Sequence, residues 1–156
     1  MPKGVYTITP RLCFEDSAFA IQFYEHAFGA KEMYRLNEPG GKVGHAEIRI
    51  GDSLIMLSDE YPEMAVLSAK SRGGSPMTLA LTVKDADKLM TQALAAGATL
   101  RRPIQEEFYG YRTGAVMDPF GYSWFIMSQI AKVSPKDMQK RLTKMAAAHK
   151  LAGSAA

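Results

Sequence analysis

The sequence of 156 residues predicts an α+β fold of two tandem strand–helix–strand–strand–strand (βαβββ) modules. We expect the modules to form a curved mixed sheet around a concave pocket, followed by a C-terminal helix. Three kinds of landmark occur twice: an acidic residue after an apolar run, a glycine at a helix end, and a hairpin glycine. The pairs are Asp16 and Asp85, Gly29 and Gly97, and Gly51 and Gly121. Their separations of 69, 68 and 70 residues indicate a duplication.

The first module is predicted over residues 6–60. Asp16 is a favourable N-cap for the helix, and Gly29 stands where a glycine commonly ends one. The predicted elements are a strand at 6–14, a helix from Asp16 to Gly29, a short strand at 31–36, and a hairpin of strands 43–50 and 53–58.

The second module repeats this order over residues 77–130, after a linker at 61–76. Its predicted elements are a strand at 77–84, a helix from Asp85 to Gly97, a strand at 99–104 and a hairpin at 113–128. We predict that residues 1–130 form a single domain and that 131–156 form a helix and tail. In that helix, Met138, Leu142 and Met145 follow one face, and we interpret them as a core-packing stripe.

The charge is modest and scattered, with 19 basic and 16 acidic residues giving +3. This pattern does not indicate a nucleic-acid partner. The single cysteine, Cys13, cannot form an internal disulfide and suits a reducing compartment. The sequence has no long apolar run or signal-peptide pattern, so we expect a cytoplasmic protein with no membrane partner.

Several short segments resemble the vicinal oxygen chelate superfamily, which includes glyoxalases, bleomycin resistance proteins and dioxygenases. The resemblance spans roughly residues 6–130 and implies the fold predicted above. It is carried by Ile21-Gln22-Phe23-Tyr24, Phe28-Gly29-Ala30, Gly51-Asp52-Ser53 and Asp118-Pro119-Phe120-Gly121-Tyr122. A PhnB-like subgroup is similar at His45-Ala46-Glu47-Ile48 and Leu57-Ser58-Asp59.

The resemblance also implies where a metal would be held, because enzymes of the family use four His or Glu side chains on four strands. Those positions fall on Thr9, Met56, Thr78 and Phe125. None of these side chains is an imidazole or carboxylate of the kind that a catalytic divalent ion requires. We therefore expect no metal at the usual site and no cofactor.

The first hairpin predicts which side chains line the pocket. A two-residue turn at Gly51-Asp52 would pair Glu47 with Met56, so His45, Glu47 and Arg49 would share a face with Met56. Three interpretations of His45 and Glu47 remain open. In the first, the two residues form a hydrogen-bonded or solvated pair on the sheet face. In the second, they recognise a ligand, and Arg49 or Arg11 binds an anionic group of it. In the third, they form a non-standard metal site or an acid–base pair.

Aromatic residues of the second module are further candidates. Tyr109 and Phe125 would face a flat ligand, whereas Trp124 would face the helix side. Arg112 follows the aromatic loop and would meet a ligand anion, unless it is an ordinary surface arginine.

These observations predict a metal-free small-molecule binding protein, with the ligand unknown, acting as a homodimer that covers exposed sheet edges. The alternative is a metal-dependent lyase, isomerase or dioxygenase that uses His45 and Glu47 with an atypical metal site. A third possibility is a structural protein with no specific ligand.

Overall fold

A computed structural model describes the backbone of residues 7–153 and the side chains as far as residue 148. The predicted beginning of the first strand at residue 6 and the end of the C-terminal tail, 154–156, lie outside the described residues.

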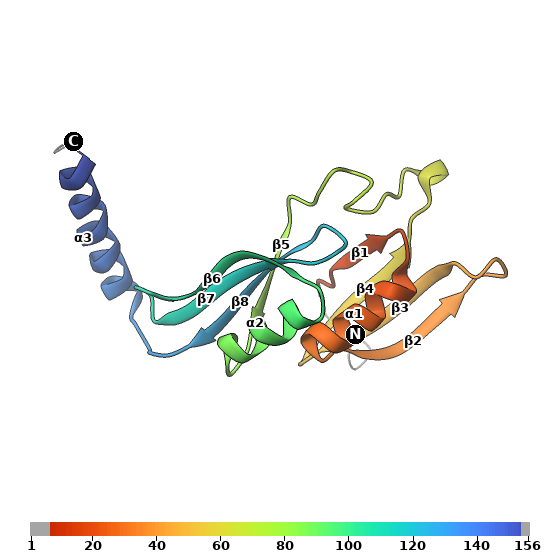
Figure 1. The fold of residues 1–156 in the computed structure, drawn as a ribbon, viewed down its shortest axis with the longest axis horizontal. Helices are drawn as coiled ribbons and strands as arrows, with labels where there is room; N and C mark the ends of the chain where they lie inside the picture. Colours follow the sequence, from red (N-terminus) through yellow and green to blue (C-terminus); the bar gives the residue numbers. More distant parts are fainter. Residues whose placement is uncertain (1–6, 154–156) are drawn as a thin grey trace.

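The first module contains four strands and one helix (Figure 1). The sheet order is β1-β4-β3-β2, in which β1 runs parallel to β4 and the other neighbours are antiparallel. The elements are β1 (Arg11–Phe14), α1 (Ser17–Phe28), β2 (Lys31–Asn37), β3 (Val43–Ile50) and β4 (Ser53–Asp59).

The second module has the same topology, with the order β5-β8-β7-β6 and β5 parallel to β8. A short 3₁₀ helix, η1 (Pro62–Met64), lies in the linker between the modules. The α+β class, the two modules and the C-terminal helix are confirmed, and the strands form two four-stranded sheets. The elements are β5 (Thr78–Thr82), α2 (Ala86–Ala95), β6 (Thr99–Glu107), β7 (Tyr111–Met117), β8 (Ser123–Gln129) and α3 (Pro135–Gly153).

The duplicated acidic residues are helix caps, as predicted. The Asp16 carboxylate accepts a 2.9 Å hydrogen bond from the Phe19 amide, and Asp85 accepts one of 2.9 Å from the Lys88 amide. Each bond satisfies one of the amides that a helix leaves without an intrahelical partner.

The first strand is shorter than predicted, beginning at Arg11 rather than near residue 6. Pro10 has no amide hydrogen to donate to a ladder. Its carbonyl still accepts a 2.9 Å hydrogen bond from the Met56 amide, so the regular pairing with β4 starts one residue later.

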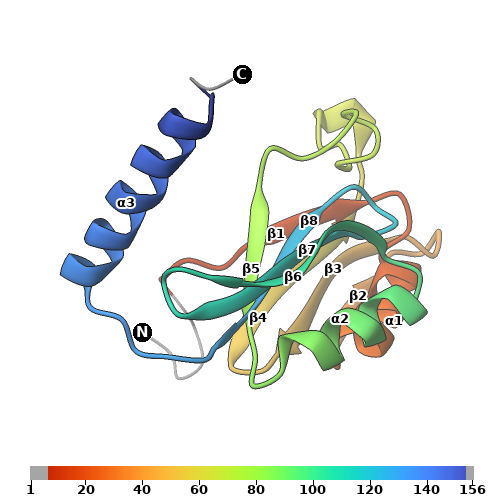
Figure 2. The same cartoon turned by 60° about the vertical axis from the view of Figure 1, so that its left-hand side comes forward.

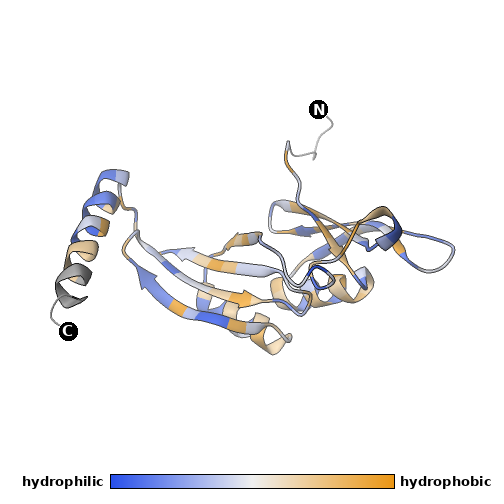
Figure 3. Ribbon diagram, turned by 90° about the horizontal axis from the view of Figure 1, so that it is seen from above, coloured by the Kyte–Doolittle hydropathy of each residue, from blue (hydrophilic) through white to orange (hydrophobic). Residues whose placement is uncertain are grey.

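Each helix covers one face of its own sheet. Apolar and more polar residues alternate along the strands (Figure 3), and the buried ones lie beneath the helix. Ile48, Leu57, Val116 and Ile126 are fully buried beneath the helices. Within residues 7–153 no helix covers the opposite face of either sheet, which we call the open face (Figures 1 and 2).

The two modules are joined through the turn between β7 and β8. The Phe120 ring lies edge-on to Phe14, Phe23 and Tyr24 of the first module, at centroid distances of 5.2, 5.7 and 6.0 Å. The Tyr122 hydroxyl donates a 3.0 Å hydrogen bond to the Cys13 carbonyl. The segment that carried part of the family resemblance therefore fastens the modules together.

Helix α3 projects away from both sheets (Figures 1 and 2). The predicted core-packing role of its apolar stripe is wrong for a single chain, because Leu142 and Met145 are both 46% exposed. Across the described residues, no helix is long and apolar enough to cross a membrane.

Candidate functional site

The open face of the first sheet carries the polar residues that the sequence predicted there. Glu47 pairs with Met56 across the hairpin, which confirms the predicted register. His45, Glu47 and Arg49 are half-buried, whereas the intervening Ala46 and Ile48 are completely buried beneath α1. The strand therefore directs these three polar side chains away from the helix.

Glu47 is the centre of this group. Its Oε1 accepts a 3.0 Å hydrogen bond from the Tyr34 hydroxyl and lies 3.5 Å from His45 Nε2. The side chains of His45 and Glu47 are 29% and 18% exposed. The hydrogen bond to Glu47 raises the pKa of Tyr34. The result is a shielded carboxylate flanked by a phenol and an imidazole.

Sequence reasoning missed Tyr34. A β-bulge between Glu32 and Tyr34 shifts the register of β2, and this shift places Tyr34 directly opposite Glu47. The aromatic ring of Tyr34 also lies 5.7 Å from the His45 ring, centroid to centroid.

Arg11 and Met56 extend the site toward β1. Arg11 pairs with Met56 in the parallel ladder, and its guanidinium donates a 3.2 Å hydrogen bond to the buried Ser58 hydroxyl.

Burial raises the pKa of the Cys13 thiol on the same strand. That thiol is therefore held in its protonated, weakly nucleophilic form.

A second polar group occupies the open face of the other sheet. The Arg102 guanidinium lies 5.3 Å from the centroid of the Phe125 ring and donates to the Glu107 carboxylate at 2.7 Å and to the Thr113 hydroxyl. Burial alone would raise the pKa of Glu107, but hydrogen bonds from Gln105, Arg102 and Thr113 outweigh it and lower that pKa.

The duplication is asymmetric at these positions. Met56 and Phe125 occupy equivalent places, because each lies in the last strand beside the first strand of its module. The partner of Met56 in the middle strand is Glu47, whereas the partner of Phe125 is Ala115. A carboxylate at this position is therefore a feature of the first module alone.

Tyr109 and Arg112 lie apart from Glu47, at the second sheet. Tyr109, in the loop after β6, lies edge-on to Phe108 and tilted against Tyr111, at centroid distances of 5.1 and 5.9 Å. Arg112 makes a bidentate ion pair with Asp87 of α2, with hydrogen bonds of 2.9 and 2.8 Å. The structure thus places Arg112 on the helix side of its sheet and not on the open face.

The residues at the family's metal positions do not fit a divalent metal ion. Thr9 precedes β1, Thr78 begins β5, and Met56 and Phe125 lie in β4 and β8. None offers an imidazole or carboxylate. Across the described part of the chain, no group of three or more His, Cys, Asp or Glu could hold a metal ion.

Comparison with known proteins gives a consistent assignment. Residues 8–126 match the Glyoxalase/Bleomycin resistance protein/Dioxygenase superfamily. The uncharacterised protein Mb0911c of Mycobacterium bovis is 37% identical over 139 residues, covering 87% of this chain and 91% of that protein. Protein YjdN of Escherichia coli K12 is 28% identical over 140 residues, covering 76% of this chain and 92% of that protein.

Solved structures agree on the fold. The X-ray structure of the Arabidopsis thaliana At5g48480 gene product has a TM-score of 0.62 and 29% identity, covering 80% of this chain and 99% of that one. TioX from Micromonospora sp. ML1 has a TM-score of 0.62 at 22% identity, covering 83% of this chain and 100% of that one. At this identity the likeness supports the fold and nothing further. With the sequence match over 8–126, these likenesses establish that the chain belongs to the glyoxalase/bleomycin resistance protein/dioxygenase superfamily.

Proposed function

We propose that the protein binds a small molecule, without a metal, on the open face of its first module. The observation that carries the proposal is the Glu47 carboxylate, which is 18% exposed on a sheet face that no helix covers in the described chain. Partial removal from water makes a carboxylate a stronger hydrogen-bond acceptor than one on an ordinary surface.

The neighbours of Glu47 support a particular chemistry for such a ligand. Oε1 is occupied by Tyr34, whereas no described residue donates a hydrogen bond to Oε2. That oxygen would accept from an N–H or O–H group of the ligand. The Tyr34 ring and Met56 offer apolar surface for a flat molecule, and Arg11, exposed at the rim, would meet an anionic group.

The absence of a metal in this proposal rests on the donor side chains. His45 and Glu47 provide two potential ligands, which is too few to select and hold a catalytic divalent ion tightly. If the purified protein retained stoichiometric zinc, nickel, manganese or iron after dialysis, the metal-dependent lyase, isomerase or dioxygenase would replace this proposal.

The test is a thermal-shift screen of flat aromatic acids and cationic glycopeptides, followed by calorimetry on compounds that raise the melting temperature. Glu47→Gln should weaken binding of such a compound by about 10-fold or more, because a charge-assisted hydrogen bond contributes about 1.5–3 kcal/mol. Glu63→Gln, at an exposed linker position, is the matched control and should leave binding unchanged. Equal affinities of the wild-type protein and Glu47→Gln would place the ligand elsewhere.

We also infer a PhnB-like affiliation within the superfamily and a cytoplasmic location. The support for the first is the segment around His45 and Glu47, and for the second it is the single reduced cysteine, Cys13. Scattered charge also favours a small-molecule partner over nucleic acid.

A further inference from the structure

We propose that α3 is an arm that docks, in a homodimer, into the groove between α1 and α2 of a second copy of the chain. This inference is independent of the small-molecule binding proposed above. It gives a geometry to the homodimer that the sequence predicts, and it accounts for an apolar stripe that has no partner within the described chain.

The arm is a helix that lacks a packing surface of its own. Residues 139–148 are all exposed, and Met138 is half-buried. Most helical stability in proteins comes from packing an apolar face, which α3 does not do within the described chain. Met138, Leu142 and Met145 have the i, i+4, i+7 spacing that a helix uses to bind a groove.

The base of the arm is fixed, so its direction is set by the fold. The Gly110 carbonyl accepts hydrogen bonds of 2.9 and 3.1 Å from the amides of Ile130 and Ala131. Arg141 donates a 2.8 Å hydrogen bond to the Phe108 carbonyl. From this base the helix points away from both sheets rather than folding back on them (Figures 1 and 2).

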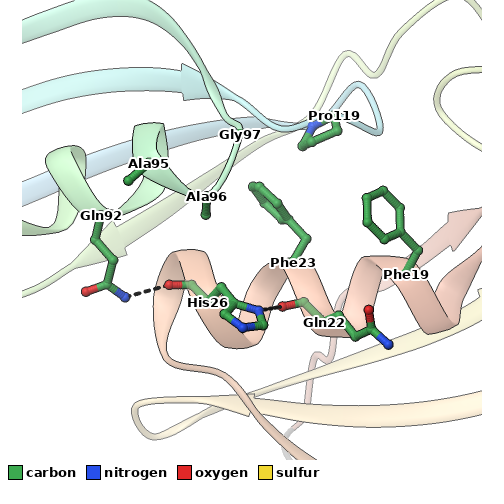
Figure 4. Close-up of a pocket in the computed structure, with 9 residues that line it drawn as sticks. All are labelled: Phe19, Gln22, Phe23, His26, Gln92, Ala95, Ala96, Gly97 and Pro119. Atoms are coloured by element: carbon green, nitrogen blue, oxygen red, sulfur yellow. Dashed lines mark hydrogen bonds between the residues drawn. The ribbon is translucent and has the colours of Figure 1, made fainter.

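The groove lies on the helix-bearing side, where the two modules meet (Figure 4). It has a volume of about 660 Å³. Phe19 and Phe23 of α1 and Pro119 form one part of it, and the small residues Ala95 and Ala96 form the other. Phe19 is 54% exposed, which is unusual for a large aromatic side chain in a monomer.

The groove has the shape and chemistry that an amphipathic helix requires. Small residues at the C-terminal end of α2 allow a third helix to approach closely, and the aromatic side chains offer apolar contact area. The Gln92 side chain donates a 2.8 Å hydrogen bond to the His26 carbonyl and closes one end of the groove. The lining contains no Asp, Glu, Lys or Arg that docking would have to desolvate.

The charges around the two surfaces are complementary. Residues 135–148 of the arm carry four basic residues and one acidic residue. Helices α1 and α2 with their N-caps, 16–28 and 85–95, carry four acidic residues and one basic residue. Asp87 pairs with Arg112, and Asp16 and Asp85 cap their helices, so the attraction for the arm comes from the net negative charge of the two helices, with Glu25 as the acidic residue that is neither a cap nor paired to Arg112. Charge complementarity of this kind steers association and fixes orientation.

The occupant must come from another copy. The arm leaves the end of the second sheet that is remote from α1, and it extends away from α1 and α2 of its own chain (Figures 1 and 3). If each of two copies places its arm in the groove of the other, the contacts are reciprocal and the assembly closes as a dimer.

The first experiment measures the oligomeric state by sedimentation equilibrium. The wild-type chain should form a dimer, and the double variant Leu142→Glu/Met145→Glu should raise the dimer dissociation constant by about 100-fold or more. Its melting behaviour at low protein concentration should change little, because both side chains are exposed in their own chain. Ala147→Glu, on the opposite face of α3, is the matched control and should dimerise normally.

The second experiment identifies the docking surface by disulfide trapping in a Cys13→Ser background. A mixture of Met145→Cys and Ala95→Cys chains should yield a cross-linked heterodimer. A mixture of Met145→Cys and Leu36→Cys chains, which tests the open sheet face, should not. A monomeric wild-type chain at high concentration, or cross-linking at Leu36→Cys instead of Ala95→Cys, would overturn the proposal.

Discussion

The Tyr24 hydroxyl donates a 2.6 Å hydrogen bond to Oδ2 of Asp118, and this contact joins helix α1 of the first module to the β7–β8 turn of the second. The same oxygen accepts a 2.9 Å bond from the Trp124 indole, and Oδ1 accepts from the amides of Phe120 and Tyr122. Burial raises the pKa of Asp118 despite these donors. A buried carboxyl group with four donors holds the two halves of the duplication in one arrangement.

Tyr24→Phe should lower the free energy of unfolding by about 1.5–3 kcal/mol, because it removes a hydrogen bond to a buried acid and leaves the ring in place. Denaturant titration is the appropriate measurement. Tyr34→Phe is the matched control, since the Tyr34 hydroxyl bonds to Glu47 at an exposed position. Its substitution should change stability by less than about 0.5 kcal/mol. If both variants lost the same free energy of unfolding, the hydrogen bond from Tyr24 to Asp118 would contribute no more to stability than the exposed one from Tyr34.

Much of the fold could be predicted from local chemistry. The caps at Asp16 and Asp85 follow from side-chain bonding to helix amides, and the pairing of Glu47 with Met56 follows from a two-residue turn. These features depend on residues that are close in sequence. The repeat spacing then showed that both modules share one topology.

The parts of the site that sequence reasoning missed lie beyond β-bulges. Tyr34 follows an irregularity after Glu32, and Arg102 lies between irregularities that begin at Leu100 and end at Gln105. A bulge inserts a residue and reverses which face the following side chains occupy, so simple alternation fails there. The insertion of Phe120 into the first module is a tertiary contact that no local pattern encodes.

Arg102→Met should destabilise the second module, because Glu107 and Thr113 lose their shared cation. We expect a loss of about 1 kcal/mol in the free energy of unfolding at neutral pH, since the Arg102 side chain is 35% exposed. The pKa of Glu107 is lowered in the fold, so this contribution is present above the unfolded pKa and is lost as pH falls through the folded one. The difference in free energy of unfolding between the wild-type protein and Arg102→Met should therefore shrink as the pH is lowered. Lys31→Met, at an exposed site, should show no such pH dependence.

Tyr61 should ionise late in an alkaline titration. A hydrogen bond to the Glu38 carboxylate, 2.6 Å long, raises the pKa of Tyr61 to about 12. Because the folded pKa lies above the ordinary value of 10.0, the stabilisation is complete below that pH and is lost as pH rises toward 12. Ultraviolet difference titration against Tyr61→Phe isolates this group. Glu38→Gln should return the midpoint toward 10.0, and an unchanged midpoint would contradict the assignment.

Gly110→Ala should be strongly destabilising, because Gly110 supports the base of the arm and has a φ of +86°. A Cβ there would lie 2.5 Å from the Ala131 carbonyl oxygen and 2.9 Å from a methyl of Val133. Left-handed backbone strain and the clash together should cost about 2–5 kcal/mol. Gly29→Ala is the control, since Gly29 has a φ of +66° with no atom within 4 Å of an added Cβ. It should cost about 1–2 kcal/mol from backbone strain alone. Denaturant unfolding of both variants measures the difference, and equal costs would show that the chain around Ala131 and Val133 shifts freely to accept the methyl group.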